Sequence, residues 1–112
     1  MVMRKTKNTL VQSNWGLQVA AKGTVGTNLD IVAIGNKRAF EFIVNAPLAN
    51  DDATLVIYKD TVSAANKLFN GYMANRDSEG RILIPDGAFC TTKFIIVVAG
   101  GSGDLFALAR MK

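Results

Sequence analysis

Residues 39–44 read Ala-Phe-Glu-Phe-Ile-Val, and this alternation predicts a β-strand with one buried face. Phe40, Phe42 and Val44 fall on one side of such a strand, while Glu41 marks the other side. Aromatic and β-branched side chains favour an extended backbone over a helix. We therefore expect Phe40, Phe42 and Val44 to face the protein core.

Similar alternation recurs along the chain. Residues 53–59 place leucine and isoleucine on one face, and residues 91–99 are apolar on both faces after the lysine, as in a central strand covered on both sides. Residues 81–84 form a shorter apolar run, and the Pro-Asp-Gly sequence at 85–87 predicts the turn that ends it. Gly100–Gly103 predicts a hairpin turn that joins the last two strands.

The segment near residues 62–74 has a different pattern. Val62, Ala65 and Phe69 have helical spacing, but Asn70 and Gly71 interrupt it. A short helix and a long loop fit this segment equally well.

Counting these runs, with weaker candidates in the first third, predicts seven or eight short strands about a dozen residues apart. Strand and helix patterns do not alternate as a parallel α/β sheet requires. We therefore expect an all-β fold, a single antiparallel β-sandwich of jelly-roll type over residues 15–112, preceded by a flexible basic arm at residues 1–14. A small five-stranded barrel of OB type is the alternative.

Composition restricts the chemistry of this protein. The 112 residues are 49% hydrophobic and 20% charged, with a net charge of +4, no histidine and one cysteine. Without imidazole, and with a single thiol, the chain lacks the ligands of a structural zinc site and the usual general base. We expect a buried, inert Cys90, no metal, no cofactor and no enzymatic activity. Residues 1–7 are not followed by the apolar run of a secretory signal peptide, which favours a cytoplasmic site of synthesis.

Basic residues supply the candidate binding site. Three of them cluster at the N-terminus with no acidic residue before Asp30, and a basic pair precedes the strand at residues 39–44. Such residues suit an acidic protein surface or phosphates. The candidate partner-binding residues are Arg4, Lys5, Lys7, Trp15, Lys37 and Arg38.

Two other functions remain open. Trp15, Tyr58 and Tyr72 are candidates for base stacking in a single-stranded nucleic-acid-binding barrel. A carbohydrate-binding or tail-associated sandwich would instead present a strip of exposed aromatic side chains.

The chain length, the strand pattern and the start MVMRKTKNTLVQSNWG at residues 1–16 resemble the decoration proteins of tailed bacteriophages. These are small jelly-roll cement or staple subunits, such as those of epsilon15-like phages. The resemblance implies a virion structural protein on the capsid surface, made in the host cytoplasm. Its partners would be the major capsid protein and copies of itself, with no membrane association. The resemblance assigns no role to any single residue.

We expect residues 1–14 to become ordered only against a partner, because a subunit that bridges neighbours needs an extended arm. Deleting this segment should abolish binding to particles and leave the β-rich circular dichroism spectrum unchanged. Unchanged binding would reject the arm hypothesis.

Overall fold

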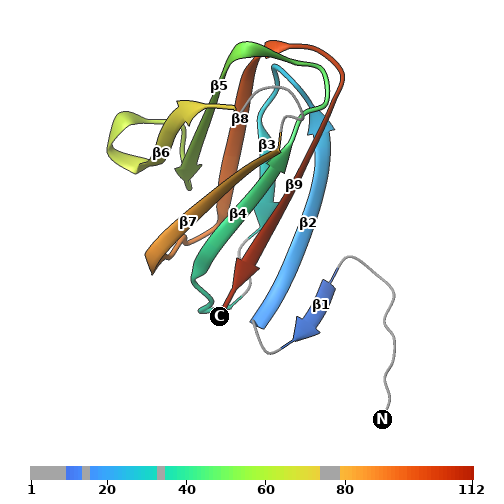
Figure 1. The fold of residues 1–112 in the computed structure, drawn as a ribbon. Coiled ribbons are helices and arrows are strands. Elements are labelled where there is room, and N and C mark those ends of the chain that lie inside the picture. The colour runs from blue at the N-terminus through green and yellow to red at the C-terminus, as the bar shows by residue number, and fades with distance from the viewer. Residues whose placement is uncertain (1–9, 14–15, 33–34, 74–78) are drawn as a thin grey trace.

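The protein consists of two antiparallel β-sheets that pack face to face (Figure 1). The computed structural model describes residues 10–13, 16–32, 35–73 and 79–112. Its elements in chain order are β1 (Leu10–Ser13), β2 (Gly16–Thr24), β3 (Leu29–Val32), β4 (Ala39–Asn45), β5 (Ala49–Lys59), a 3₁₀ turn η1 (Ala64–Asn66), β6 (Lys67–Tyr72), β7 (Glu79–Ala88), β8 (Lys93–Gly101) and β9 (Asp104–Met111).

The strand order is that of a jelly roll. One sheet has the order β1-β2-β9-β4-β7 and the other the order β3-β8-β5-β6, with antiparallel pairing throughout. From β2 onward the chain alternates between the two sheets, except at the hairpin that joins β5 to β6. The expected jelly-roll sandwich is confirmed. The sheets are open, so the barrel alternative is wrong, and the described residues contain nine strands instead of seven or eight.

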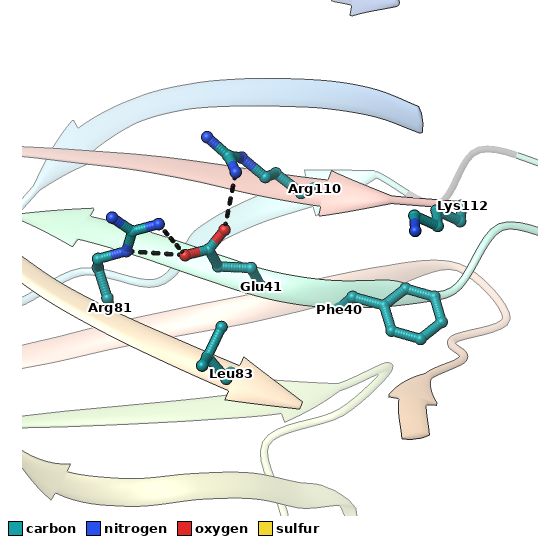
Figure 2. A pocket seen from close by; sticks show the side chains of 6 residues that line it. All are labelled: Phe40, Glu41, Arg81, Leu83, Arg110 and Lys112. Atoms are coloured by element: carbon teal, nitrogen blue, oxygen red, sulfur yellow. Dashed lines mark hydrogen bonds and ion pairs between the residues drawn. The ribbon is translucent and has the colours of Figure 1, made fainter. Parts of the chain in front are cut away.

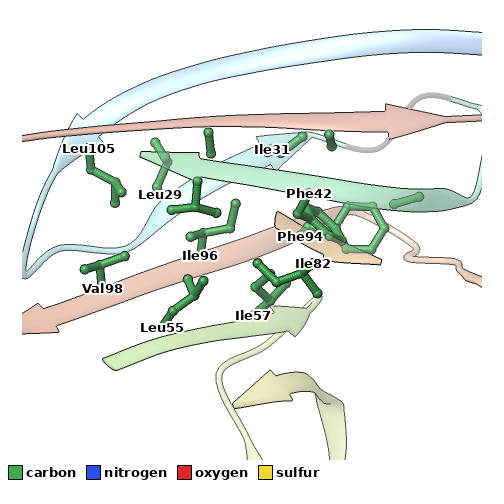
Figure 3. Packing of buried hydrophobic residues seen from close by; sticks show 14 of the residues in the cluster. Leu29, Ile31, Phe42, Leu55, Ile57, Ile82, Phe94, Ile96, Val98 and Leu105 are labelled. Carbon is green, nitrogen blue, oxygen red and sulfur yellow. The ribbon is translucent and has the colours of Figure 1, made fainter. Parts of the chain in front are cut away.

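Alternating side chains on the inner faces form one apolar core (Figure 3). Leu55 and Ile57 point into it, as their period-two spacing predicts. Phe42 on β4 meets Phe94 on β8 edge to face across the two sheets, with ring centroids 5.2 Å apart and an interplanar angle of 76°. Both rings are fully buried, so this pair joins the middle strands of the two sheets.

Within the segment near residues 62–74, the described residues 62–73 form neither an α-helix nor a long loop. A single 3₁₀ turn at Ala64–Asn66 leads into β6, which pairs with β5. Asn70 and Gly71 are poor helix formers, and both lie in register with β5, at Val56 and Leu55. Tertiary pairing therefore overrides the apparent helical spacing.

A β-bulge at Phe40 corrects the expected orientation of that side chain. Ala39 pairs with Met111 and Glu41 with Arg110, so Phe40 is an extra residue in β4 with no partner in β9. The bulge turns Ala39 into the core and places Phe40 beside Glu41 on the outer face.

The Pro-Asp-Gly sequence does not end its strand, contrary to expectation. Residues 84–87 form an irregularity inside β7, opposite Phe40. Gly87 has φ 74°, and a Cβ there would lie 2.7 Å from Cζ of Phe40. A larger residue would therefore meet both a strained backbone and the phenylalanine ring.

The late glycines do not form a hairpin, because β8 and β9 lie in different sheets. The expected positive φ angles are present, but they carry the chain from one sheet to the other. Gly101 has φ 139°, and a Cβ there would lie 2.7 Å from the carbonyl oxygen of Leu48. The glycines therefore allow a close approach of two backbone segments at the end of the sandwich.

Every outer strand of the two sheets is short or interrupted. The strands β1 and β3 have four residues each, β7 contains the irregularity at residues 84–87 with Pro85, and β6 has a register shift against β5 opposite Ile57 and Tyr58.

The segment Leu10–Ser13, assigned above to the arm, forms β1 on β2, whereas residues 1–9 lie outside the described residues. The arm hypothesis stays a prediction, and a deletion of residues 1–9 tests it without removing β1.

We expect Phe42→Ala to lower the free energy of unfolding by about 3–5 kcal/mol, because it opens a cavity between the sheets. Phe42→Leu should cost less, since much of the volume is kept. Phe106→Ala is the matched control, because that ring is 40% exposed on the outer face. Urea unfolding followed by circular dichroism measures all three variants. Equal losses for Phe42→Ala and Phe106→Ala would contradict the central role of Phe42.

Candidate functional site

The predicted partner-binding residues divide into two groups. Arg4, Lys5, Lys7 and Trp15 lie outside the described residues. Lys37 and Arg38 are exposed just before β4.

Arg38 forms two backbone hydrogen bonds with Lys112. Its backbone N–H donates to the carbonyl oxygen of Lys112 at 2.8 Å, and the N–H of Lys112 donates to the carbonyl oxygen of Arg38 at 2.9 Å. Its guanidinium carbon lies 6.0 Å from the ring centroid of Phe89. Arg38 thus lies beside Lys112, a basic residue that sequence reasoning did not select, while Lys37 makes no described contact with either.

A groove of about 420 Å³ lies on the outer face of the five-stranded sheet (Figure 2). Six side chains from β4, β7, β9 and the residue after β9 line it: Phe40, Glu41, Arg81, Leu83, Arg110 and Lys112. We call this site the β4–β9 groove.

Strand register brings these side chains together. Glu41 is paired with Arg110 of β9 on one side and with Leu83 of β7 on the other. Arg81 is two residues from Leu83 and therefore projects from the same face of β7. The bulge adds Phe40 to this row. The groove is therefore a direct consequence of the jelly-roll strand order.

Glu41 is the centre of an ion-pair network in the groove. Its Oε2 accepts from Nε of Arg81 at 2.8 Å and lies 2.5 Å from Nη2 of the same guanidinium. Its Oε1 lies 3.2 Å from Nη1 of Arg110. The Glu41 side chain is only 7% exposed, whereas that of Arg81 is 59% exposed. Two arginines therefore compensate one buried carboxylate, and the excess charge of this network is positive.

Cations also lie over phenylalanine rings on this face. Nζ of Lys112 is 5.9 Å from the ring centroid of Phe40, and Nζ of Lys22 is 5.6 Å from that of Phe106. At these distances a cation is attracted by the face of the ring. The outer face of the five-stranded sheet thus combines positive charge with apolar area, including Leu83, which is 70% exposed.

Sequence reasoning placed Glu41 on the outer face but missed the groove. Arg110 and Lys112 alternate with the buried Met111, and Arg81 and Leu83 flank the buried Ile82, so period two alone assigns these residues to an outer face. Which strands lie side by side is not contained in that pattern.

A second polar cluster joins two connections at one end of the sandwich. The Asp60 carboxylate accepts hydrogen bonds from the backbone N–H of Thr92 at 2.7 Å and of Thr91 at 2.9 Å, and from the Thr92 hydroxyl at 3.0 Å. The backbone hydrogen bonds of Thr92 and Thr91 lower the pKa of Asp60 from 3.8 to about 2. Asp60 has φ 64°, so its backbone also adopts the left-handed conformation of a tight turn. This cluster fixes the connection after β5 to the one before β8.

Cys90 lies in the core close to this cluster. The residue is 3% exposed, and burial, followed by the charge of Asp60, raises its pKa from 9.0 to about 11. The thiol is therefore protonated near neutral pH, as a buried inert cysteine should be.

Within the described ranges, no group of three acidic or cysteine side chains is arranged to hold a metal ion. Over the same residues, no helix is both long and apolar enough to cross a bilayer.

Comparison of this chain with protein-family models, with characterised proteins and with solved structures gives no match.

We expect the stability provided by Asp60 to depend on pH. Because the pKa of Asp60 is lower in the folded protein, its contribution is complete above about pH 4 and is lost as the pH falls through about 2. Asp60→Asn should therefore lower the urea midpoint above about pH 4, and the two proteins should converge near pH 2. Asparagine also tolerates the left-handed backbone, so the variant isolates the carboxylate. A constant difference at every pH would contradict this assignment.

Proposed function

We propose that this chain is a non-enzymatic virion structural protein, a decoration subunit that binds the outer surface of a capsid in many copies. It stabilises the particle by bridging major capsid subunits. The subunit is made in the host cytoplasm and acts on the capsid surface.

The observation that carries this proposal is the outer face of the five-stranded sheet. Arg81 and Arg110 pair there with one carboxylate beside the exposed Leu83, and Lys112 lines the same groove. Exposed apolar side chains rimmed by charge are typical of a protein-binding surface. Jelly rolls are also common among viral capsid domains, which supports the proposal by analogy of fold.

Face-to-face adhesion suits the rest of the molecule. The outer strands are short or interrupted, so the faces of the sandwich offer more continuous contact area than its edges. Binding through one such face is weak for a single subunit. Many copies that bridge neighbouring subunits of one capsid lattice strengthen the total binding, because each copy adds its own contacts.

Single-stranded nucleic-acid binding is the second candidate, because cations and phenylalanine rings also occur together on nucleic-acid-binding surfaces. The ring of Phe40 is poorly placed for base stacking. Lys112 lies over it, and its edge abuts Gly87. The β4–β9 groove therefore suits a protein surface better than stacked bases.

We expect the chain to sediment with particles that contain a major shell protein and packaged DNA. Particles depleted of the chain should release DNA at a lower temperature, and adding the purified chain should restore the release temperature. Sucrose-gradient sedimentation and a DNA-binding dye measure the two properties.

The controls for this experiment come from the two faces of the sandwich. Arg81→Gln lies in the β4–β9 groove, and Lys67→Gln is a matched loss of one exposed cation on β6. Lys67→Gln should restore the release temperature fully, and Arg81→Gln should restore it less. A deletion of residues 1–9 tests the arm in the same assay. If the chain stays entirely in the particle-free fraction, or if it binds an oligonucleotide better than particles, the proposal is wrong.

A further inference from the structure

We propose that the β4–β9 groove binds an extended peptide segment of a protein partner, one that presents a carboxylate beside an apolar side chain. This inference rests on the proposed function and names the chemistry by which the partner is recognised. It is carried by charge complementarity and by the distribution of apolar area in the groove.

The positive charge of the groove exceeds its negative charge. Arg81 and Arg110 bring two guanidinium groups to a groove whose lining holds one carboxylate, that of Glu41. Glu41 engages Nε and Nη2 of Arg81, while Nη1 of Arg81 makes no hydrogen bond within the described part of the chain. Because this guanidinium is 59% exposed, its remaining N–H groups can donate to a second carboxylate from solvent.

Glu41 also holds both arginines in position before any partner arrives. Arg110 reaches Glu41 from the neighbouring strand β9 and Arg81 reaches it from β7, so the carboxylate holds two guanidinium groups that come from opposite sides (Figure 2). The rotamer entropy that long side chains lose on binding is therefore partly lost already on folding. A preorganised pair of this kind favours a carboxylate of defined position over diffuse negative charge.

Apolar area lies next to these donors. Leu83 is paired with Glu41 across the β4–β7 ladder, directly before the irregularity at residues 84–87, and is 70% exposed. Phe40 lines the same groove. A partner side chain that covers Leu83 removes apolar surface from water and lies close to Arg81, which projects from the same face of β7 two residues away. The spacing of charge and apolar area thus matches two side chains that lie two residues apart, on one face of an extended peptide.

A peptide fits the groove better than a nucleic acid does. A nucleic-acid backbone carries one negative charge on every phosphodiester and needs a row of cations along its path, whereas the arginines here are gathered around a single carboxylate, that of Glu41. The groove is also small, at about 420 Å³, and its ring at Phe40 is covered by Lys112. Only a short part of a continuous phosphate backbone could contact the positive side chains of the groove. A single acidic residue, in contrast, could bind all of the available donors.

The test is the affinity of the full chain for labelled peptides, measured by fluorescence anisotropy at low salt. The first probe is a short peptide in which a glutamate and a leucine are separated by one serine, so that both side chains lie on the same face of the extended chain. The others are the same peptide with glutamine for glutamate, the same peptide with glycine for leucine, and a thymidine oligonucleotide. We expect the glutamate–leucine peptide to bind about tenfold more tightly than either substituted peptide, because each substitution removes one half of the recognition.

Matched variants locate the binding site. Leu83→Ser and Arg81→Gln should each weaken binding of the glutamate–leucine peptide about tenfold. Val32→Ser removes a similarly exposed apolar side chain from the other sheet, and Lys67→Gln removes an exposed cation there, so both should bind as the unchanged protein does. Circular dichroism confirms that each variant is folded.

Three outcomes would overturn the inference. They are equal affinity for the glutamate and glutamine peptides, binding insensitive to Leu83→Ser, and tighter binding of the oligonucleotide. The outcome is separable from that of the particle experiment. A chain that stabilises particles without binding the peptide refutes only the groove, and a chain that binds the peptide but no particle refutes only the capsid role.

Discussion

The insertion of β9 between β2 and β4 is the interaction on which the structure depends. Eight consecutive residues of β9 pair with β2, and the other edge of β9 pairs with β4. The inward side chains of β9, from Leu105 to Met111, are buried against the opposite sheet. Without this strand the five-stranded sheet would separate into two hairpin-sized pieces, and neither would cover the core. The same insertion places Arg110 beside Glu41, so fold and candidate site have a common origin.

The bulge at Phe40 shows how a local irregularity converts a sheet face into a shaped surface. A regular strand would direct Phe40 inward, whereas one extra residue directs it to the solvent side. The irregularity of β7 at residues 84–87 leaves space opposite, where Gly87 contacts the ring. Together the two features border a groove whose floor is the ion-pair network of Glu41. A flat sheet with the same residues would present charge without a concave site.

Period two in the sequence predicted the fold class and most of the core. Leu55, Ile57 and the apolar run in β8 follow from alternation alone, because a strand that covers a core must alternate. The bulge was not predictable, since an extra residue in β4 is defined only against its neighbours. The late glycines show the same limit: their positive φ angles were foreseen, but which strands they join depends on sheet order. The β4–β9 groove needed three strands from distant parts of the sequence, and no local pattern contains that information.

The short and interrupted outer strands affect how readily copies of this protein can aggregate through their sheet edges. An unpaired strand edge is a template on which another chain can extend a sheet, and such growth leads to fibres or amorphous aggregates. Here Pro85 has no N–H to donate along β7, and the described parts of β1 and β3 have four residues each. Any neighbour that tried to continue either sheet would gain only a few backbone hydrogen bonds. The described outer strands therefore make poor templates for backbone pairing between copies of this protein.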